Sequence, residues 1–170
     1  SIVALVGGDH RVVEAHRNAV DHALGLMEKF IRPQSGAETG NFLVAKFLHE
    51  VSRELDPHLH THAIALNLTR DDERWRAIDS RLLFQMRRLG TRAYRAALSN
   101  QLHLLGYGVD VAADRHLEIA GIDRDMVDHF SARHRQIAEH RAESPVSGPV
   151  ADRIAQEATR AAKREIDPRA

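Results

Sequence analysis

Residues 47–70, FLHEVSRELDPHLHTHAIALNLTR, constrain the fold of this chain more than any other stretch of the sequence. An extended segment with β-branched and aromatic residues is followed by a polar turn with an Asp-Pro pair and then by a second alternating segment. This pattern predicts a β-hairpin. Because successive side chains of a strand point to opposite faces, His58, His60 and His62 are expected on one face of its second arm.

The first arm decides whether these histidines form a site. Directly opposed residues of an antiparallel pair share a face, so His49 joins the others only if opposed residue numbers add to an odd value. A turn centred at residues 54–55 has that parity. It predicts His49 opposite His60 and Phe47 opposite His62, which brings three imidazoles together.

Three histidines without a fourth protein ligand are typical of a metal site that keeps open positions for substrate. We predict that His49, His60 and His62 bind a divalent metal ion, whether Mg, Mn, Zn or Ni. Neutral imidazole suits Zn and Ni, whereas Mg normally prefers oxygen ligands. His58 is left out because it lies beside Pro57 at the mouth of the turn. The alternative is a chance surface cluster, since the chain has 12 His.

Residues 39–79 carry several short motifs in a fixed order. These are Thr-Gly-Asn, His-Glu-x-x-Ser-Arg, Asp-Pro-x-Leu-His-Thr-His and Trp-Arg-Ala. Together they closely resemble the conjugative relaxases of the TrwC/TraI (MobF) type, which are single-strand DNA nicking enzymes of the histidine-hydrophobe-histidine superfamily. The resemblance continues through residues 1–20 and 158–170, so it covers essentially the whole chain.

The resemblance implies a palm-like antiparallel sheet that carries the histidines and is flanked by helices. It also implies a metal ion that positions the scissile phosphate while a tyrosine hydroxyl attacks it and becomes linked to the 5′ end of the nicked strand. The implied partners are single-stranded or hairpin DNA at a plasmid transfer origin and accessory relaxosome proteins.

The tyrosines of this chain depart from that pattern. The nucleophilic tyrosines of such relaxases lie upstream of the segment that residues 1–6 resemble, and only Tyr94 and Tyr107 occur here. Tyr94 falls in a predicted helix and Tyr107 between two glycines, which favours packing roles. We therefore assign no catalytic residue and expect an inactive relaxase fragment, truncated at the start and also at the end.

The composition sets bounds on the class of protein. A length of 170 residues suits one domain, residues 1–170, rather than two. Lys+Arg and Asp+Glu both number 24, so the net charge by itself does not indicate nucleic-acid binding. No Cys is present, which excludes disulfides and thiolate metal sites. No apolar run is long enough for a membrane span, and we expect a cytoplasmic protein.

The remaining sequence predicts an antiparallel α+β fold, because strands and helices do not alternate as in a parallel sheet. A helix is expected over residues 9–31, with His10, His16 and His22 near its wet side. The other expected elements are a strand over 1–6, a loop over 33–40, a helix over 80–105 capped by Asp79 and interrupted near Gly90, strands over 107–111 and 116–120, a helix over 124–143, a linker to 149 and a last helix from 150.

Basic residues near the hairpin and at the end of the chain are candidates for phosphate contacts. The alternative is a solvated surface with acidic residues interleaved. The candidates are Arg70, Arg74, Arg76, Arg160, Lys163 and Arg164.

Three classes of function remain open from the sequence. The first is metal-dependent DNA nicking and strand transfer, in the intact protein. The second is a non-catalytic metal-binding and DNA-binding module of the same fold. The third is an unrelated three-histidine metal hydrolase or cupin-like oxygenase, which the long helical patterns disfavour.

Overall fold

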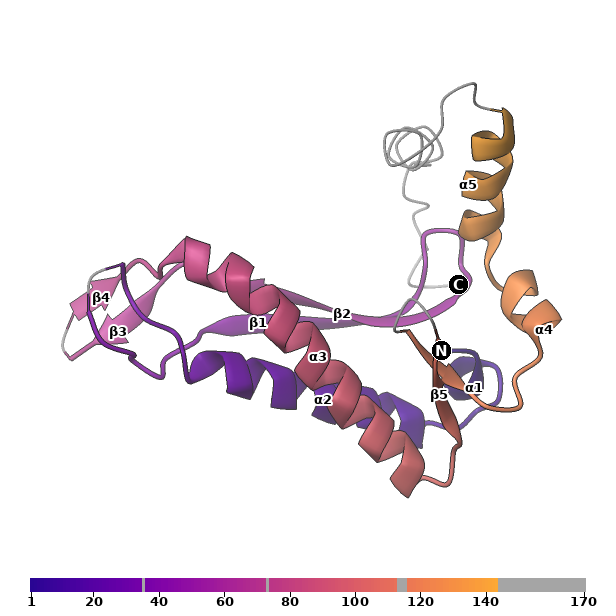
Figure 1. The fold of residues 1–170 in the computed structure, drawn as a ribbon, viewed down its shortest axis with the longest axis horizontal. Helices are drawn as coiled ribbons and strands as arrows, with labels where there is room; N and C mark the ends of the chain where they lie inside the picture. Colours follow the sequence, from indigo (N-terminus) through magenta and orange to yellow (C-terminus); the bar gives the residue numbers. More distant parts are fainter. Residues whose placement is uncertain (35, 73, 113–115, 144–170) are drawn as a thin grey trace, which may run out of the picture.

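The computed structural model describes residues 1–34, 36–72, 74–112 and 116–143, and its helices and antiparallel strands confirm the predicted α+β class. Two long helices run beside a long hairpin, and a small hairpin lies at one end (Figure 1). These elements are α2 (Arg11–Glu28), α3 (Ser80–Leu104), β1 (Val44–Val51), β2 (Pro57–Ala65), β3 (Thr69–Asp71) and β4 (Arg74–Arg76). The other end holds α1 (Ile2–Leu5), β5 (Val109–Val111), β6 (Leu117–Ile119), α4 (Arg124–His129) and α5 (Ala132–Glu143).

The first residues form the short helix α1, so the predicted strand over residues 1–6 is wrong. A short apolar run does not distinguish a buried strand from a buried helical turn by periodicity alone. Ala4 is fully buried in the core, and the chain turns back tightly after it. A Cβ atom at Gly7 would lie 2.7 Å from the carbonyl oxygen of Val3, so this close approach requires glycine.

Helices α2 and α3 pack against each other along small residues. The predicted helix over 9–31 is confirmed as α2, with Ala15, Ala19 and Ala23 buried at four-residue spacing. Asp79 caps α3 as predicted, because its carboxylate accepts a 3.1 Å hydrogen bond from the backbone N–H of Arg81. The predicted interruption at Gly90 is wrong, since α3 continues through it.

Gly90 serves helix packing rather than a break. It is buried, and a Cβ atom there would lie 2.7 Å from Sδ of Met27 on α2. We expect Gly90→Val to lower the free energy of unfolding by about 2 kcal/mol, because the added methyl groups overpack this contact. Urea denaturation measures the change.

Gly25 provides the matched control for Gly90, because a Cβ atom there meets nothing within 4 Å. Gly25→Val is expected to be neutral or stabilising, since valine favours the helix over glycine. Adding Met27→Ala should recover part of the loss caused by Gly90→Val. Equal effects of the two glycine variants would contradict the packing role of Gly90.

Strands β1 and β2 pair in the predicted register. His49 lies opposite His60 and Phe47 opposite His62. The register shifts between His49 and Val51, so the pairing becomes irregular only beyond His49, next to the turn. In the turn, Leu55 adopts a φ of 66°, and the Ser52 hydroxyl oxygen accepts hydrogen bonds from two backbone N–H groups.

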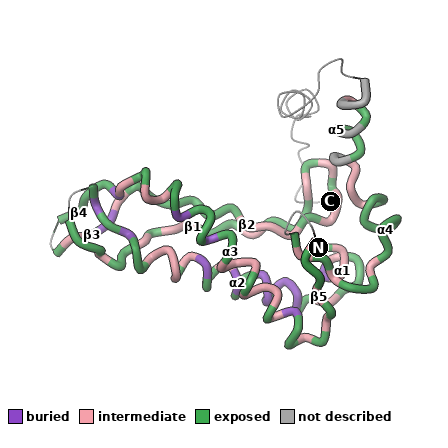
Figure 2. Tube along the Cα trace, in the orientation of Figure 1, coloured by how far each residue is buried: buried purple, intermediate pink, exposed green. Residues whose placement is uncertain are grey.

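The two faces of this hairpin have different surroundings. One face turns toward the helices: Leu48 and Leu59 pack against the core cluster, and Lys46 pairs with Asp21 of α2. The other face, which we call the histidine face, carries Ala45, Phe47, His49, His60, His62 and Ile64. Figure 2 shows the buried positions on α2 and α3, whereas no residue of β1 or β2 is fully buried.

The last described elements confirm the predicted strand pair and correct one helix. β5 and β6 pair within the predicted ranges. The predicted helix over 124–143 is split into α4 and α5, and Asp56 of the hairpin turn accepts a 2.8 Å hydrogen bond from the first N–H of α5. The predicted linker to 149 and the last helix lie outside the described residues. No helix in the described ranges is long and apolar enough to cross a membrane.

Candidate metal centre

Three imidazoles meet on the histidine face. The ring centroids of His49 and His60 lie 5.2 Å apart, those of His49 and His62 4.9 Å, and those of His60 and His62 5.0 Å. The pairing of β1 with β2 sets these separations, because His49 and His60 are direct partners and His62 is two residues further along the same strand. The backbone thus gathers the three predicted ligands.

The ring separations suit one shared ion. Three imidazoles around a tetrahedral ion at a metal–nitrogen distance of about 2.1 Å place their centroids about 5 Å apart. In the structure as it stands, the rings meet by faces and edges. Accordingly, no group of three His, Asp or Glu side chains in the described ranges has its ligand atoms set to hold an ion. Joint coordination of one ion would require the rings to turn about their χ angles.

His60 has a defined tautomer. Its Nδ1 lies 2.7 Å from the backbone carbonyl oxygen of His58. A carbonyl oxygen only accepts, so Nδ1 carries the proton and donates, and the lone pair of a neutral ring is on Nε2. Histidine ligands of metals commonly donate their other ring N–H in this way. The backbone of β2 therefore leaves Nε2 as the nitrogen of a neutral His60 that carries the lone pair.

His58, which the sequence argument left out, lies close to the other three. Its ring centroid is 4.6 Å from that of His60. Two effects lower the pKa of His58. The larger is the partial burial of its ring, and the smaller is the charge of His60. Its backbone contributes the acceptor that orients His60, which is a role no residue pattern predicts.

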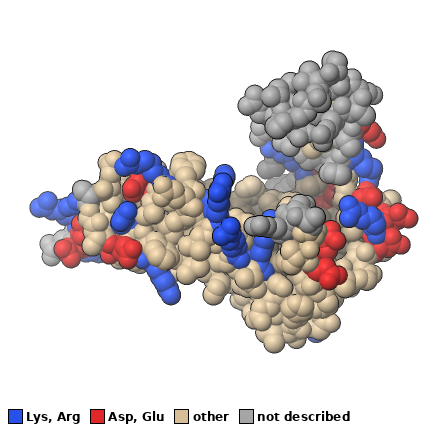
Figure 3. Space-filling model, viewed as in Figure 1, with Lys and Arg blue, Asp and Glu red and all other residues tan. Residues whose placement is uncertain are grey.

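The predicted basic residues lie away from the histidines where the structure describes them. Arg70 is on β3 and Arg76 on β4, beyond the end of β2 that is far from the turn. The Nε of Arg76 lies 3.4 Å from a carboxylate oxygen of Asp71. Acidic and basic side chains are interleaved at this end of the molecule (Figure 3). Arg160, Lys163 and Arg164 lie outside the described residues.

His16 is buried, so the expectation that it lies near the wet side of its helix is wrong. Its side chain is only 5% exposed and forms two hydrogen bonds of 2.8 Å: Nδ1 with the hydroxyl of Tyr94, and Nε2 with the hydroxyl of Thr61. Burial lowers the pKa of His16 and favours its neutral form. The signal was present in the sequence, because His16 is four residues after Val12 and three before Ala19 on the apolar stripe.

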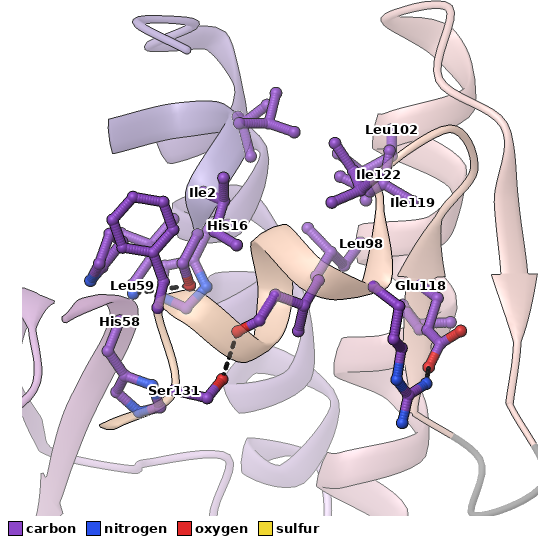
Figure 4. Close-up of a pocket in the computed structure, with 18 of the residues that line it drawn as sticks. Ile2, His16, His58, Leu59, Leu98, Leu102, Glu118, Ile119, Ile122 and Ser131 are labelled. Carbon is purple, nitrogen blue, oxygen red and sulfur yellow. Dashed lines mark hydrogen bonds and ion pairs between the residues drawn. The ribbon is translucent and has the colours of Figure 1, made fainter. Parts of the chain in front are cut away.

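A cavity of about 440 Å³ opens beside this buried histidine. His16, His58 and Leu59 lie on one side of it, and Leu102, Ile119 and Ile122 lie on the other (Figure 4). Its lining combines apolar side chains with polar groups such as those of His16, Tyr94 and Ser131. On its wall, Nη1 of Arg124 lies 3.7 Å from Oε1 of Glu118. His58 thus borders both this cavity and the ring of His60.

Both tyrosines of the chain have structural partners. Burial raises the pKa of Tyr94, whose hydroxyl binds His16 on the helix side of the hairpin. The hydroxyl of Tyr107 donates to a carboxylate oxygen of Asp9, and this hydrogen bond raises the pKa of Tyr107. Asp9 also accepts from Arg11 through two side-chain hydrogen bonds. Neither tyrosine is on the histidine face.

Comparison with known proteins gives consistent matches over the full chain. The family model described as TrwC relaxase matches residues 1–170. The multifunctional conjugation protein TraI of Escherichia coli strain K12 is 30% identical over 185 residues, which covers 99% of this chain and 10% of TraI. The chain thus spans about a tenth of the length of the curated relatives it matches.

Solved structures of the conjugative relaxase TrwC are similar to this chain in fold. A metal-bound complex with oriT DNA matches with a TM-score of 0.85 and 36% identity, covering 99% of this chain and 62% of the solved chain. A complex with a 27-mer DNA comprising the recognition hairpin and the cleavage site has a TM-score of 0.86, 36% identity and coverages of 99% and 64%. A copper-bound complex has a TM-score of 0.84, 37% identity and coverages of 98% and 61%.

Proposed function

Because this chain belongs to the TrwC relaxase family, we propose that it is the metal-binding and DNA-binding part of a conjugative relaxase. In the intact protein this enzyme nicks one strand of a plasmid transfer origin and transfers it. The observation that carries the proposal is the register of β1 and β2, which gathers three imidazoles on an open face. We further propose that residues 1–170 form part of one relaxase domain, located in the cytoplasm, where the absence of Cys is compatible with a reducing environment.

His49, His60 and His62 are the proposed ligands of one divalent metal ion. An all-imidazole set favours Zn or Ni over Mn, and it suits Mg least. When bound, such an ion stabilises the charge that develops on the phosphate oxygens during strand cleavage. The Nδ1–H of His60 holds its ring through the carbonyl of His58, and the absence of a fourth protein ligand leaves room for a phosphate oxygen.

The histidine face also suits the bases of a single strand. Phe47, which lies opposite His62 on β1, is 51% exposed, and Ile64, two residues after His62 on β2, is 57% exposed. Exposed aromatic and aliphatic side chains next to a charged site are typical of surfaces on which nucleobases stack. The proposed DNA partner is the single strand or hairpin of a transfer origin, with accessory relaxosome proteins as further partners.

The attacking hydroxyl does not come from this chain in our proposal. Tyr94 faces the helices, and Tyr107 binds Asp9, so neither can reach a phosphate on the histidine face without leaving its partner. The attack in our proposal is therefore made by a tyrosine other than these two. Because neither tyrosine of this chain is the proposed nucleophile, a second candidate function is a metal-binding and DNA-binding module without nicking activity. An unrelated three-histidine hydrolase does not agree with the family match.

Hairpin oligonucleotide binding by this chain tests the proposal. We expect affinity, measured by fluorescence anisotropy, to fall steeply between about 50 and 200 mM salt because phosphate contacts release counterions. Arg70→Ala and Arg76→Ala should each reduce the salt slope by about 1, if each cation contacts one phosphate. The chain alone should not cleave the oligonucleotide.

Arg88→Ala is the matched control, because Arg88 is an exposed residue of α3, the helix that packs on α2 behind the hairpin. It should leave the salt slope unchanged. Affinity that does not respond to salt would contradict the proposed phosphate contacts. Cleavage by the chain alone would contradict the placement of the nucleophile outside this chain and implicate Tyr94, Tyr107 or water.

A further inference from the structure

Three side chains from three elements form a hydrogen-bonded line beneath the histidine face. Tyr94 of α3 binds His16 of α2, and His16 binds Thr61 of β2, with both hydrogen bonds 2.8 Å long. Thr61 is the residue between His60 and His62. Its side chain points to the helices, while theirs point to the open face.

The burial of His16 shows that this line replaces ordinary apolar packing. His16 is surrounded on α2 by the buried residues Val12, Ala15 and Ala19, where a polar ring without partners would be costly. Both of its nitrogens are satisfied. A neutral imidazole donates through one nitrogen and accepts through the other, and each hydroxyl can take either part. These directional hydrogen bonds fix the position of β2 relative to the two helices more closely than contacts between aliphatic groups would.

The hairpin formed by β1 and β2 needs a hydrogen-bonded link to the helices to hold its position. A two-stranded ribbon is at best marginally stable by itself, and no residue of β1 or β2 is fully buried. The pairing also becomes irregular just beyond His49, on the side of the turn. A small rotation or slide of β2 would move His60 and His62 together. On β2, the hydroxyl of Thr61 is hydrogen-bonded to His16 of α2, and on β1, Lys46 pairs with Asp21 of the same helix.

We propose that His16 is a positioning residue for the histidine face, which acts through Thr61 and is itself oriented by Tyr94. This inference rests on the proposed metal site. His16 does not touch the ion. It holds the strand that carries His60 and His62 at a fixed depth and rotation relative to α2 and α3, so that the two rings can reach a common ion with His49.

Two substitutions at Thr61 separate positioning from packing. Thr61→Val keeps the shape of the side chain and its preference for a strand but removes the hydroxyl. Thr61→Ser keeps the hydroxyl and removes the methyl group. We expect Thr61→Val to weaken binding of Zn²⁺, measured by calorimetry, about tenfold, as for other residues that orient metal ligands, and Thr61→Ser to bind nearly as the unmodified chain does. A role in packing alone predicts the reverse order.

Variants elsewhere on the line and a control complete the test. Tyr94→Phe should weaken Zn²⁺ binding less than Thr61→Val, because it removes only the outer hydrogen bond. Thr91→Val removes an exposed hydroxyl of α3, which binds the backbone of Arg87, and should leave the affinity unchanged. Circular dichroism of each variant verifies that the comparison is made between folded proteins.

The outcomes distinguish the two proposals. Unchanged Zn²⁺ affinity in Thr61→Val, or a greater loss in Thr61→Ser, with binding by the unmodified chain intact, overturns the positioning role alone. Failure of the unmodified chain to bind Zn²⁺ overturns the metal site and the positioning role with it. Loss in Thr61→Val, retention in Thr61→Ser and no change in Thr91→Val support the role of His16.

Discussion

Replacing His60 by alanine is expected to weaken binding of Zn²⁺ to this chain by at least about a hundredfold. Removing a residue that only supports a metal ligand costs up to about that factor, and His60 is itself a proposed ligand. His60 contacts both other imidazoles of the proposed set, and its Nδ1–H is already held by the carbonyl of His58. Its loss leaves two ligands, which hold an ion much less firmly than three. Isothermal titration calorimetry measures the change.

Two other histidines serve as controls for His60. His22→Ala changes an exposed histidine of α2 and should leave Zn²⁺ binding intact. His58→Ala removes a neighbouring ring but keeps the backbone carbonyl that orients His60, so binding should also persist. A loss in His58→Ala as large as that in His60→Ala would show that the ligand set has been assigned wrongly.

Leu102→Ala is expected to lower the free energy of unfolding by about 3 kcal/mol, through loss of buried apolar contact and the cavity left behind. Leu102 is 3% exposed and forms one core cluster with Ala4, Val12 and Val13. Leu48 and Leu59 of the hairpin pack against that cluster. The substitution therefore loosens the contact that joins α1, α2, α3 and the hairpin, and urea denaturation measures its cost.

Leu104 supplies the matched control, two residues further along α3 and 75% exposed. Leu104→Ala removes the same atoms from a side chain that is mostly in water, so its effect should stay within about 0.5 kcal/mol. A similar cost at both positions would contradict the central place of Leu102 in the core.

The hairpin could be predicted because its constraints are local. The two-residue period, the turn signal and the parity of the residue numbers are enough to place His49 opposite His60. The cap at Asp79 and the pairing of β5 with β6 follow from equally local patterns. The ligand role of the histidines is a chemical proposal added to this confirmed geometry.

The failures of prediction arise where a distant residue decides the local structure. Gly90 reads as a helix break until Met27 of another helix is seen to occupy the space beside it. At the split between α4 and α5, the first N–H of α5 donates to Asp56, a residue of the hairpin turn. The burial of His16 depends on hydroxyl partners from α3 and β2. Sequence periodicity does not contain such contacts between distant segments.

The alternation along β2 places two kinds of constraint on alternate residues of one strand. Leu59 packs against the core cluster and Thr61 is hydrogen-bonded to His16 of α2. His60 and His62 lie on the open face of the same strand. Sequence changes at the even-numbered positions of the strand can therefore alter the open face. The odd-numbered positions preserve the scaffold while that change takes place.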